Sequence, residues 1–141
     1  MGREFNRREP DVPGAPHLRH IRQSVALAAF TDGTGASGTF VLTNGTIPVG
    51  AVVTACFLEA LVGFSGGTAV ITVGDGSDSD RYMTGTPDVA STLATGLDLG
   101  VPSGAKYHAA AKSVTITIAE TTDFGTIVAG SLRIVVEYLE P

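Results

Sequence analysis

From Ser24 onward, short apolar runs alternate with clusters of Gly, Asn, Asp and Ser along the chain. The clearest alternation, over residues 113–118, places three apolar side chains on one face of a strand and hydroxyl side chains on the other. A second period of two runs over residues 131–139, and residues 68–73 are β-branched apart from Ala69, which favours a strand over a helix. These patterns predict an all-β domain.

The other expected strands are shorter or less regular, and they lie at residues 24–30, 39–43, 51–62, 81–84 and 106–111. The segment 51–62 also contains a helical stripe, but Pro48 and Gly50 precede it and β-branched residues begin it. We therefore interpret it as part of a hairpin that turns at residues 63–67. About eight short strands separated by turns predict an eight-stranded antiparallel β-sandwich that is jelly-roll-like.

The first 23 residues have no sustained period and contain prolines at positions 10, 13 and 16. Five of the nine basic residues of the chain lie here: Arg3, Arg7, Arg8, Arg19 and Arg22. We divide the chain into an extended, basic arm at 1–23 and a β-sandwich domain at 24–141. The arm is either a solvated terminus or a segment that becomes ordered on a partner. We favour the second interpretation, in which the five arginines bind an acidic surface of that partner.

Composition excludes several classes of protein. A chain of 141 residues fits one domain, and its apolar content of 43% argues against disorder. A single cysteine, Cys56, excludes a disulfide framework, and a net charge of −5 is unusual for a nucleic-acid-binding domain. The longest apolar run, 51–64, is too short for a membrane span and includes Glu59. Residues 1–6 contain no apolar stretch, so we expect no secretory signal.

One sequence motif resembles a catalytic motif. Residues 63–67 match the G-x-S-x-G pattern around Ser65, with His108 downstream as a nominal base. That motif works where a strand turns into a helix above a parallel sheet, whereas a β-branched run follows it here. We interpret it as a turn, and a small hydrolase that uses Ser65 and His108 is the weakest alternative.

The densest acidic cluster consists of Asp75, Asp78 and Asp80. Such carboxylates can bind Ca²⁺, but the spacing does not fit an EF-hand loop. We favour a turn without metal in which Arg81 neutralises one carboxylate, and cation binding stays open.

The remaining candidate residues also have structural interpretations. His17 and His20 have a helical ligand spacing, but prolines surround them and no third ligand is near. Cys56 lies among apolar residues, which is typical of a buried and unreactive thiol. Asn44-Gly45 is typical of a turn. We therefore expect no catalytic, cofactor-binding or metal site.

Two runs in the first half of the chain resemble a known family. Residues 47–54 read Ile-Pro-Val-Gly-Ala-Val-Val-Thr, and residues 66–78 contain a Gly-Gly turn, a β-rich strand and the loop Val-Gly-Asp-Gly-Ser-Asp. This pattern resembles small virion proteins of tailed bacteriophages, and most closely capsid cement (decoration) proteins of the jelly-roll type. The resemblance covers roughly residues 38–85.

The resemblance implies a non-enzymatic role on the outer surface of a phage head. Such proteins bridge neighbouring major capsid subunits, stabilise the shell and commonly act as homodimers or homotrimers. It also implies synthesis in the host cytoplasm, with no nucleic-acid or membrane partner and no cofactor. The alternatives are another virion component, such as a tail, fibre or head–tail connector protein, and a carbohydrate- or receptor-binding jelly-roll module.

Overall fold

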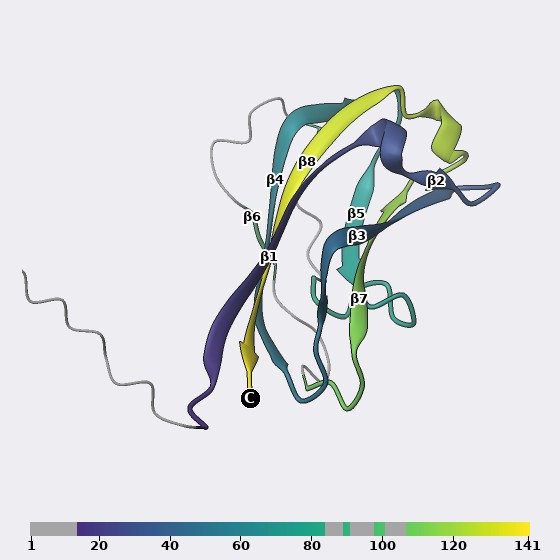
Figure 1. The fold of residues 1–141 in the computed structure, drawn as a ribbon. Helices are drawn as coiled ribbons and strands as arrows, with labels where there is room; N and C mark the ends of the chain where they lie inside the picture. Colours follow the sequence, from purple (N-terminus) through teal and green to yellow (C-terminus); the bar gives the residue numbers. More distant parts are fainter. Residues whose placement is uncertain (1–13, 84–88, 91–97, 101–106) are drawn as a thin grey trace, which may run out of the picture.

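Two antiparallel β-sheets face each other in two layers (Figure 1). The structure is a computed structural model that describes residues 14–83, 89–90, 98–100 and 107–141. Sheet A has the strand order β1-β8-β4-β6, and sheet B has the order β2-β3-β7-β5. The all-β, two-sheet expectation is confirmed.

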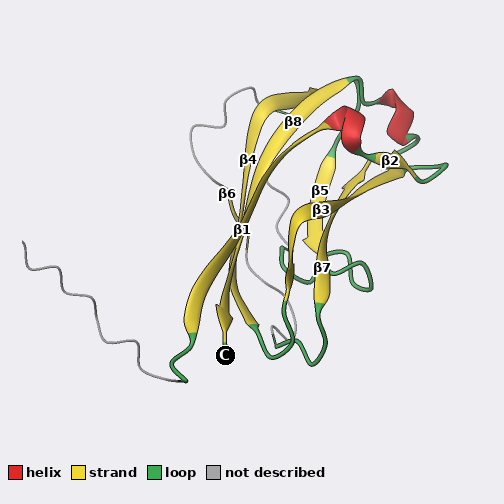
Figure 2. Cartoon of the chain, viewed as in Figure 1, coloured by secondary structure: helices red, strands yellow, loops and turns green. Residues whose placement is uncertain are grey.

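Sheet A consists of β1 (His17–Ala26), β8 (Ala129–Glu140), β4 (Val52–Ser65) and β6 (Asp98–Gly100). Sheet B consists of β2 (Thr31–Asp32), β3 (Ser37–Ile47), β7 (Lys112–Ala119) and β5 (Val70–Gly74). Two short 3-10 turns, η1 (Leu27–Ala29) and η2 (Phe124–Thr126), lie at the end of the sandwich opposite the C-terminus (Figure 2). Among the described residues, no helix is long and apolar enough to cross a bilayer.

The core lies between the sheets and follows the alternation of the strands. In β7, the side chains of Val114, Ile116 and Ile118 are fully buried. In β8, every second residue from Leu132 to Val136 is likewise buried. One face of each of these strands meets the opposite sheet and the other meets solvent. The alternation of apolar and polar residues in the sequence follows from this packing.

The strand expected at 51–62 is present as β4, but it does not form a hairpin with the strand that follows it. It is a single strand of 14 residues, which pairs with β8 through three register irregularities. Phe57 and Leu61, which belong to the helical stripe of the sequence, are only partly buried, whereas Cys56 and Leu58 face the core. After Ser65 the chain turns at Gly66 (φ 97°) and enters β5 in the opposite sheet, so the turn joins two sheets.

Two of the eight strands expected from the sequence do not form strands in the part of the chain that the structure describes. The segments 81–84 and 106–111 lie partly outside the described residues, and their described parts form only single bridges, Met83 with Val73 and Tyr107 with Val52. β2 and β6, which the sequence does not predict, span two and three residues.

The expected boundary of the arm is also corrected. β1 begins at His17 and pairs with β8 along its whole length, so residues 17–23 belong to the sandwich and not to an arm. Ile21 and Val25 are buried in the core, whereas the residues between them are polar or small. An edge strand with so few buried positions looks like a solvated segment in the sequence. Residues 1–13 lie outside the described residues.

Gln23 ties the free edge of β1 to sheet B. Its side-chain oxygen accepts hydrogen bonds from the backbone N–H groups of Thr43 (2.9 Å) and Asn44 (3.2 Å), and its amide donates to the Thr43 hydroxyl (3.0 Å). The Asn44 amide donates to the carbonyl oxygen of Arg22 (3.2 Å). Asn44-Gly45 is therefore not a turn: it lies inside β3 at an irregularity of its pairing with β7, and it fastens one sheet to the other.

Candidate functional site

The structure describes two of the five arginines that the sequence analysis singled out. Arg19 and Arg22 lie on β1, and the Nε atom of Arg19 is 2.9 Å from a carboxylate oxygen of Glu140 on β8. Arg22 is exposed and makes no side-chain bond within the described chain. The other three, Arg3, Arg7 and Arg8, lie outside the described residues. Residues 1–13 contain as many acidic as basic residues, so the excess of positive charge in the expected arm comes from β1.

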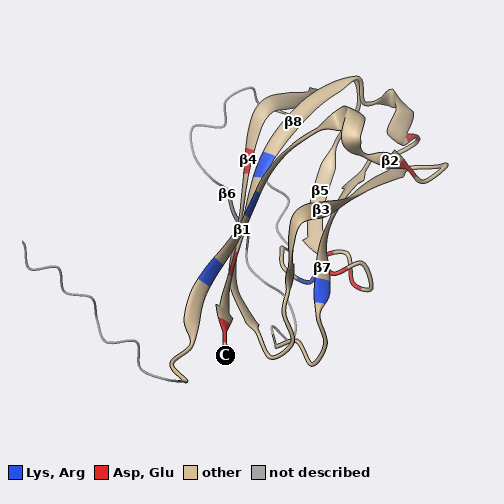
Figure 3. Ribbon diagram, in the orientation of Figure 1, with Lys and Arg blue, Asp and Glu red and all other residues tan. Residues whose placement is uncertain are grey.

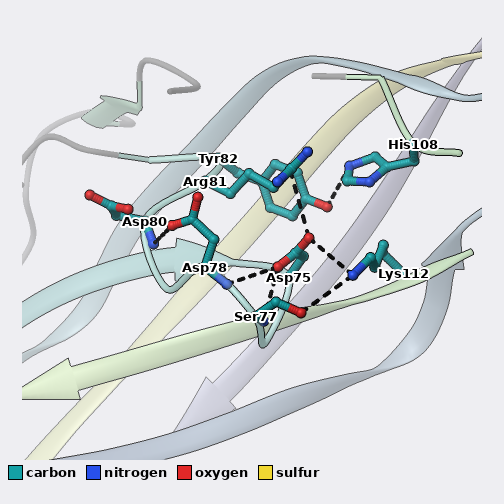
Figure 4. Close-up of polar contacts among 8 residues, drawn as sticks. All are labelled: Asp75, Ser77, Asp78, Asp80, Arg81, Tyr82, His108 and Lys112. Atoms are coloured by element: carbon teal, nitrogen blue, oxygen red, sulfur yellow. Dashed lines mark hydrogen bonds and ion pairs between the residues drawn. The ribbon is translucent and has the colours of Figure 1, made fainter. Parts of the chain in front are cut away.

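The acidic loop after β5 is organised around the carboxylate of Asp75 (Figure 4). Asp75 is buried, and one of its oxygens accepts hydrogen bonds from the backbone N–H groups of Ser77 and Asp78, both at 3.0 Å. These bonds close a tight turn that Gly76 completes with a φ of 81°. The sequence pattern Asp-Gly-Ser-Asp is typical of such a turn, and this interpretation agrees with the geometry.

Two cations neutralise the other oxygen of Asp75. Nε of Arg81 lies 3.7 Å from it and Nζ of Lys112 lies 3.5 Å from it (Figure 4). Burial alone would raise the pKa of Asp75, but the two backbone donors and the charges of Lys112 and Arg81 outweigh burial and lower that pKa. The carboxylate therefore stays ionised at neutral pH and serves as the counter-ion of two side chains.

The three aspartates do not converge on one point. Asp78 turns toward Asp80, accepts from its backbone N–H at 3.4 Å, and raises the pKa of Asp80 through a side-chain hydrogen bond. Within the described ranges, no group of three or more His, Cys, Asp or Glu side chains is arranged to hold a metal ion. The Asp75 carboxylate, which would be the central ligand of a cation, already faces Arg81 and Lys112.

A buried polar pair lies next to this loop. The Tyr82 hydroxyl and Nε2 of His108 are 2.7 Å apart, and both side chains are almost completely buried. Burial raises the pKa of Tyr82. Burial and the nearby Arg81 charge lower the pKa of His108, so the imidazole is neutral at physiological pH. The backbone of His108 also pairs with Gly50 and Ala51, which fixes the segment that begins at Tyr107 to the turn before β4.

We expect the stability of the protein to fall as the pH drops below about 6.5, because His108 binds a proton more weakly in the folded state than in the unfolded state. His108→Gln, which has an amide for Tyr82 but does not titrate, should reduce this slope. The measurement is the free energy of urea unfolding at several pH values between 7.5 and 5. His17→Gln, at the exposed start of β1, is the matched control; an unchanged slope in His108→Gln would contradict the prediction.

The residues of the nominal hydrolase motif serve separate roles. Ser65 is exposed at the end of β4, where its backbone carbonyl accepts from Val128, whereas His108 is buried against Tyr82. His17 and His20 are three residues apart on a strand and so point to opposite faces, and His20 faces Glu137 at 3.2 Å. Burial raises the pKa of the Cys56 thiol to about 12, as expected for an unreactive cysteine.

Charged residues lie mainly on the strands of sheet A, and few lie on the strands of sheet B (Figure 3). On sheet B, four threonines stand in register across the strands β2, β3, β7 and β5: Thr31, Thr39, Thr117 and Thr72. On sheet A, charged pairs cross the outer face, with Arg133 bound to Glu59 and His20 facing Glu137. The outer face of sheet B is thus uncharged along its strands, and that of sheet A is mixed.

Exposed and half-buried apolar side chains gather at the end of sheet A near the C-terminus. Leu18, Leu139, Val52 and Tyr107 form one row, because each is paired in register with the next. Val49 lies in the turn before β4, next to Gly50, where an added Cβ would lie 3.0 Å from Cγ of Pro141. We call these residues the end patch: Leu18, Val49, Val52, Tyr107, Leu139 and Pro141. The sequence analysis missed this patch because strand pairing brings its members together from four separate segments.

The fold has a counterpart among solved structures. A chain in "Cyanophage Pam1 capsid asymmetric unit" is similar to this chain with a TM-score of 0.59 and 21% sequence identity. The similarity covers 94% of this chain and 91% of that chain. At this level of identity it shows a shared fold. Comparison of the sequence with models of protein families finds no match, and comparison with curated proteins finds none either.

Proposed function

We propose that this protein is a structural component of a phage virion, and more narrowly a capsid cement protein that binds the outside of the head and bridges major capsid subunits. The observation that carries the proposal is the shared fold with a chain of a cyanophage capsid asymmetric unit. The similarity spans almost the whole of both chains, so it concerns the complete domain and not a common supersecondary unit. The motifs in residues 47–54 and 66–78 point to the same class of protein.

The strand order supports the jelly-roll part of the proposal. In a jelly roll, two Greek keys are folded into facing sheets, and the chain crosses repeatedly from one sheet to the other. From β3 to β8, each strand lies in the sheet opposite to that of the strand before it, and β8 returns to pair with β1. The bridge between Met83 and Val73 stands at the edge of β5, where a further strand of sheet B would lie.

The proposed role is binding and not catalysis. The polar side chains that resemble catalytic groups are engaged within the fold: Asp75 with Arg81 and Lys112, and His108 with Tyr82. The proposed partners are the major capsid protein and further copies of this chain, as a homodimer or homotrimer. A net charge of −5 supports a role without direct nucleic-acid contact.

The carbohydrate-binding alternative loses support in the structure. Sugar sites usually present exposed aromatic faces, and of the three tyrosines Tyr82 is fully buried and Tyr138 packs against the core. Tyr107 alone among the tyrosines is strongly exposed, at 57%. A tail, fibre or connector protein would share the virion location, but it would be present in far fewer copies.

We expect this chain to co-band with the major capsid protein when particles from its native source are separated on a density gradient. Quantitative mass spectrometry should give a ratio near one to one, because a cement protein occupies positions repeated over the whole shell. A few copies per particle would contradict the cement role and indicate the tail or connector. Absence from every particle fraction would contradict the virion role altogether.

A further inference from the structure

We propose that the end patch is the surface through which this protein sits on the capsid shell, and that its partner there is an apolar protein surface flanked by acidic side chains. The inference rests on the proposed function, and it adds which part of the molecule faces the shell. Its starting observation is the row from Leu18 to Tyr107, which runs across the outer face of sheet A at the end where β8 reaches the C-terminus (Figure 1).

Three large apolar side chains of the end patch are more than half exposed. Leu18 is 52% exposed, Val49 60% and Tyr107 57%, so three of the largest exposed apolar side chains lie in one place. Scattered exposed apolar residues are normal on a protein surface, whereas contiguous ones mark contact sites. Aromatic residues such as Tyr107 are enriched in protein interfaces, because they bury a large area at a small cost in conformational entropy.

The charges beside the end patch decide which partner fits. Both carboxylates near it are already engaged: Glu140 faces Arg19 at 2.9 Å, and Glu137 accepts from the Thr54 hydroxyl at 2.8 Å and faces His20. Arg22, two rows along the same face, has no side-chain bond within the described residues, so a positive charge without a counter-ion lies beside the end patch. A two-fold contact of end patch with end patch would offer Arg22 only side-chain carboxylates that are already engaged. An acidic flank on a different protein would neutralise this charge.

The size of the end patch also argues against a simple dimer. A stable interface uses about 20–30 residues on each side, far more than this patch supplies. The 13 residues outside the described structure at the N-terminus join the chain at Gly14, four residues before Leu18. In extended form they reach up to about 45 Å, and they carry Arg3, Arg7 and Arg8. A broad surface such as a capsid shell is able to meet both the end patch and this segment.

The test uses heads assembled without this protein, to which purified full-length protein is added and the bound fraction measured by sedimentation. Leu18→Glu/Tyr107→Glu adds two negative charges to the end patch. Val41→Glu/Val70→Glu is the matched control on the outer face of sheet B, where the two valines are 51% and 36% exposed. We expect at least a tenfold loss of affinity for the first variant and little change for the control. Equal melting temperatures check that both variants fold.

The outcomes separate the inference from the proposed function. If wild-type protein does not bind heads, the cement role fails and the inference with it. If wild-type protein binds and the end-patch variant binds equally well, the inference is overturned and the cement role stands. Selective loss of binding in the sheet B control overturns the inference in favour of the outer face of sheet B. If the end-patch variant instead loses self-association in the absence of heads, the patch is a contact between copies and the inference is overturned.

Discussion

Replacing Asp75 with Ala is expected to lower the free energy of unfolding by about 3 kcal/mol, one of the two largest effects that we predict for a single substitution. The side chain of Asp75 is only 1% exposed, and it is the counter-ion of both Arg81 and Lys112. Lys112 can turn toward water, but Nε of Arg81 is buried and has no hydrogen-bond partner. Removing the carboxylate therefore leaves an uncompensated cation and two unpaired backbone N–H groups in the loop.

Thermal unfolding measures this effect, and the expected loss corresponds to a fall in melting temperature of about 10 °C for a domain of this size. Asp78→Ala is the matched control, because it removes an acidic side chain from the same loop that faces neither Arg81 nor Lys112. Asp75→Asn keeps an oxygen for Ser77 and Asp78 and so isolates the contribution of charge. A loss in Asp78→Ala as large as that in Asp75→Ala would contradict the assignment.

The stability of the same variants should also differ in its dependence on pH. The pKa of Asp75 is lowered in the folded state, so its stabilising contribution is complete above the ordinary carboxyl pKa of about 4. The contribution is lost as the pH falls through the lower folded-state value. Asp75→Asn should remove this part of the acid sensitivity. Glu120 retains its own part, because hydrogen bonds from Thr122, Thr121 and Thr68 lower the pKa of its exposed carboxylate.

The sequence predicted the strands whose two faces differ most. In β7 and β8 one face is buried and the other is solvated, and the apolar residues therefore alternate. Residues 17–23 of β1 were missed because Ile21 alone among them is buried, and much of their attachment comes from backbone pairing and from Gln23. Such contacts leave no periodic trace in a sequence. The strand at 51–62 was predicted, but its hairpin with the next strand was wrong, because the turn at 63–67 leads into the opposite sheet and no local pattern shows that crossing.

The polar clusters were only partly predictable, for a different reason. The turn at Asp75 and the contact with Arg81 are local, so the pattern of the loop predicted them. The contributions of Lys112 and His108 depend on long-range packing: 35 residues separate Lys112 from Ser77, and 26 separate His108 from Tyr82. These contacts follow from the pairing of β5 with β7 and of Tyr107 with Val52. No local motif in the sequence predicts that register.

Gly130→Ala is the second substitution with a large expected effect, because backbone conformation and packing both require glycine there. Gly130 is the second residue of β8 and has a φ of 152°, which residues with a side chain rarely adopt. An added Cβ would also lie 2.3 Å from Cδ1 of the buried Phe64 ring. Backbone strain and overpacking together should cost about 3 kcal/mol, measured as a shift in the urea midpoint.

A control and a compensating substitution identify the cause of that loss. Gly35→Ala places a Cβ in open space without a positive φ, so it should leave the midpoint almost unchanged. If contact with the ring contributes, Phe64→Leu should recover part of the loss in the Gly130→Ala background, although alone it destabilises the core. Strictly additive effects of the two substitutions would mean that backbone conformation alone requires glycine at position 130. Sub-additive effects would assign the remainder to the packing of Phe64 between the start of β8 and the end of β4.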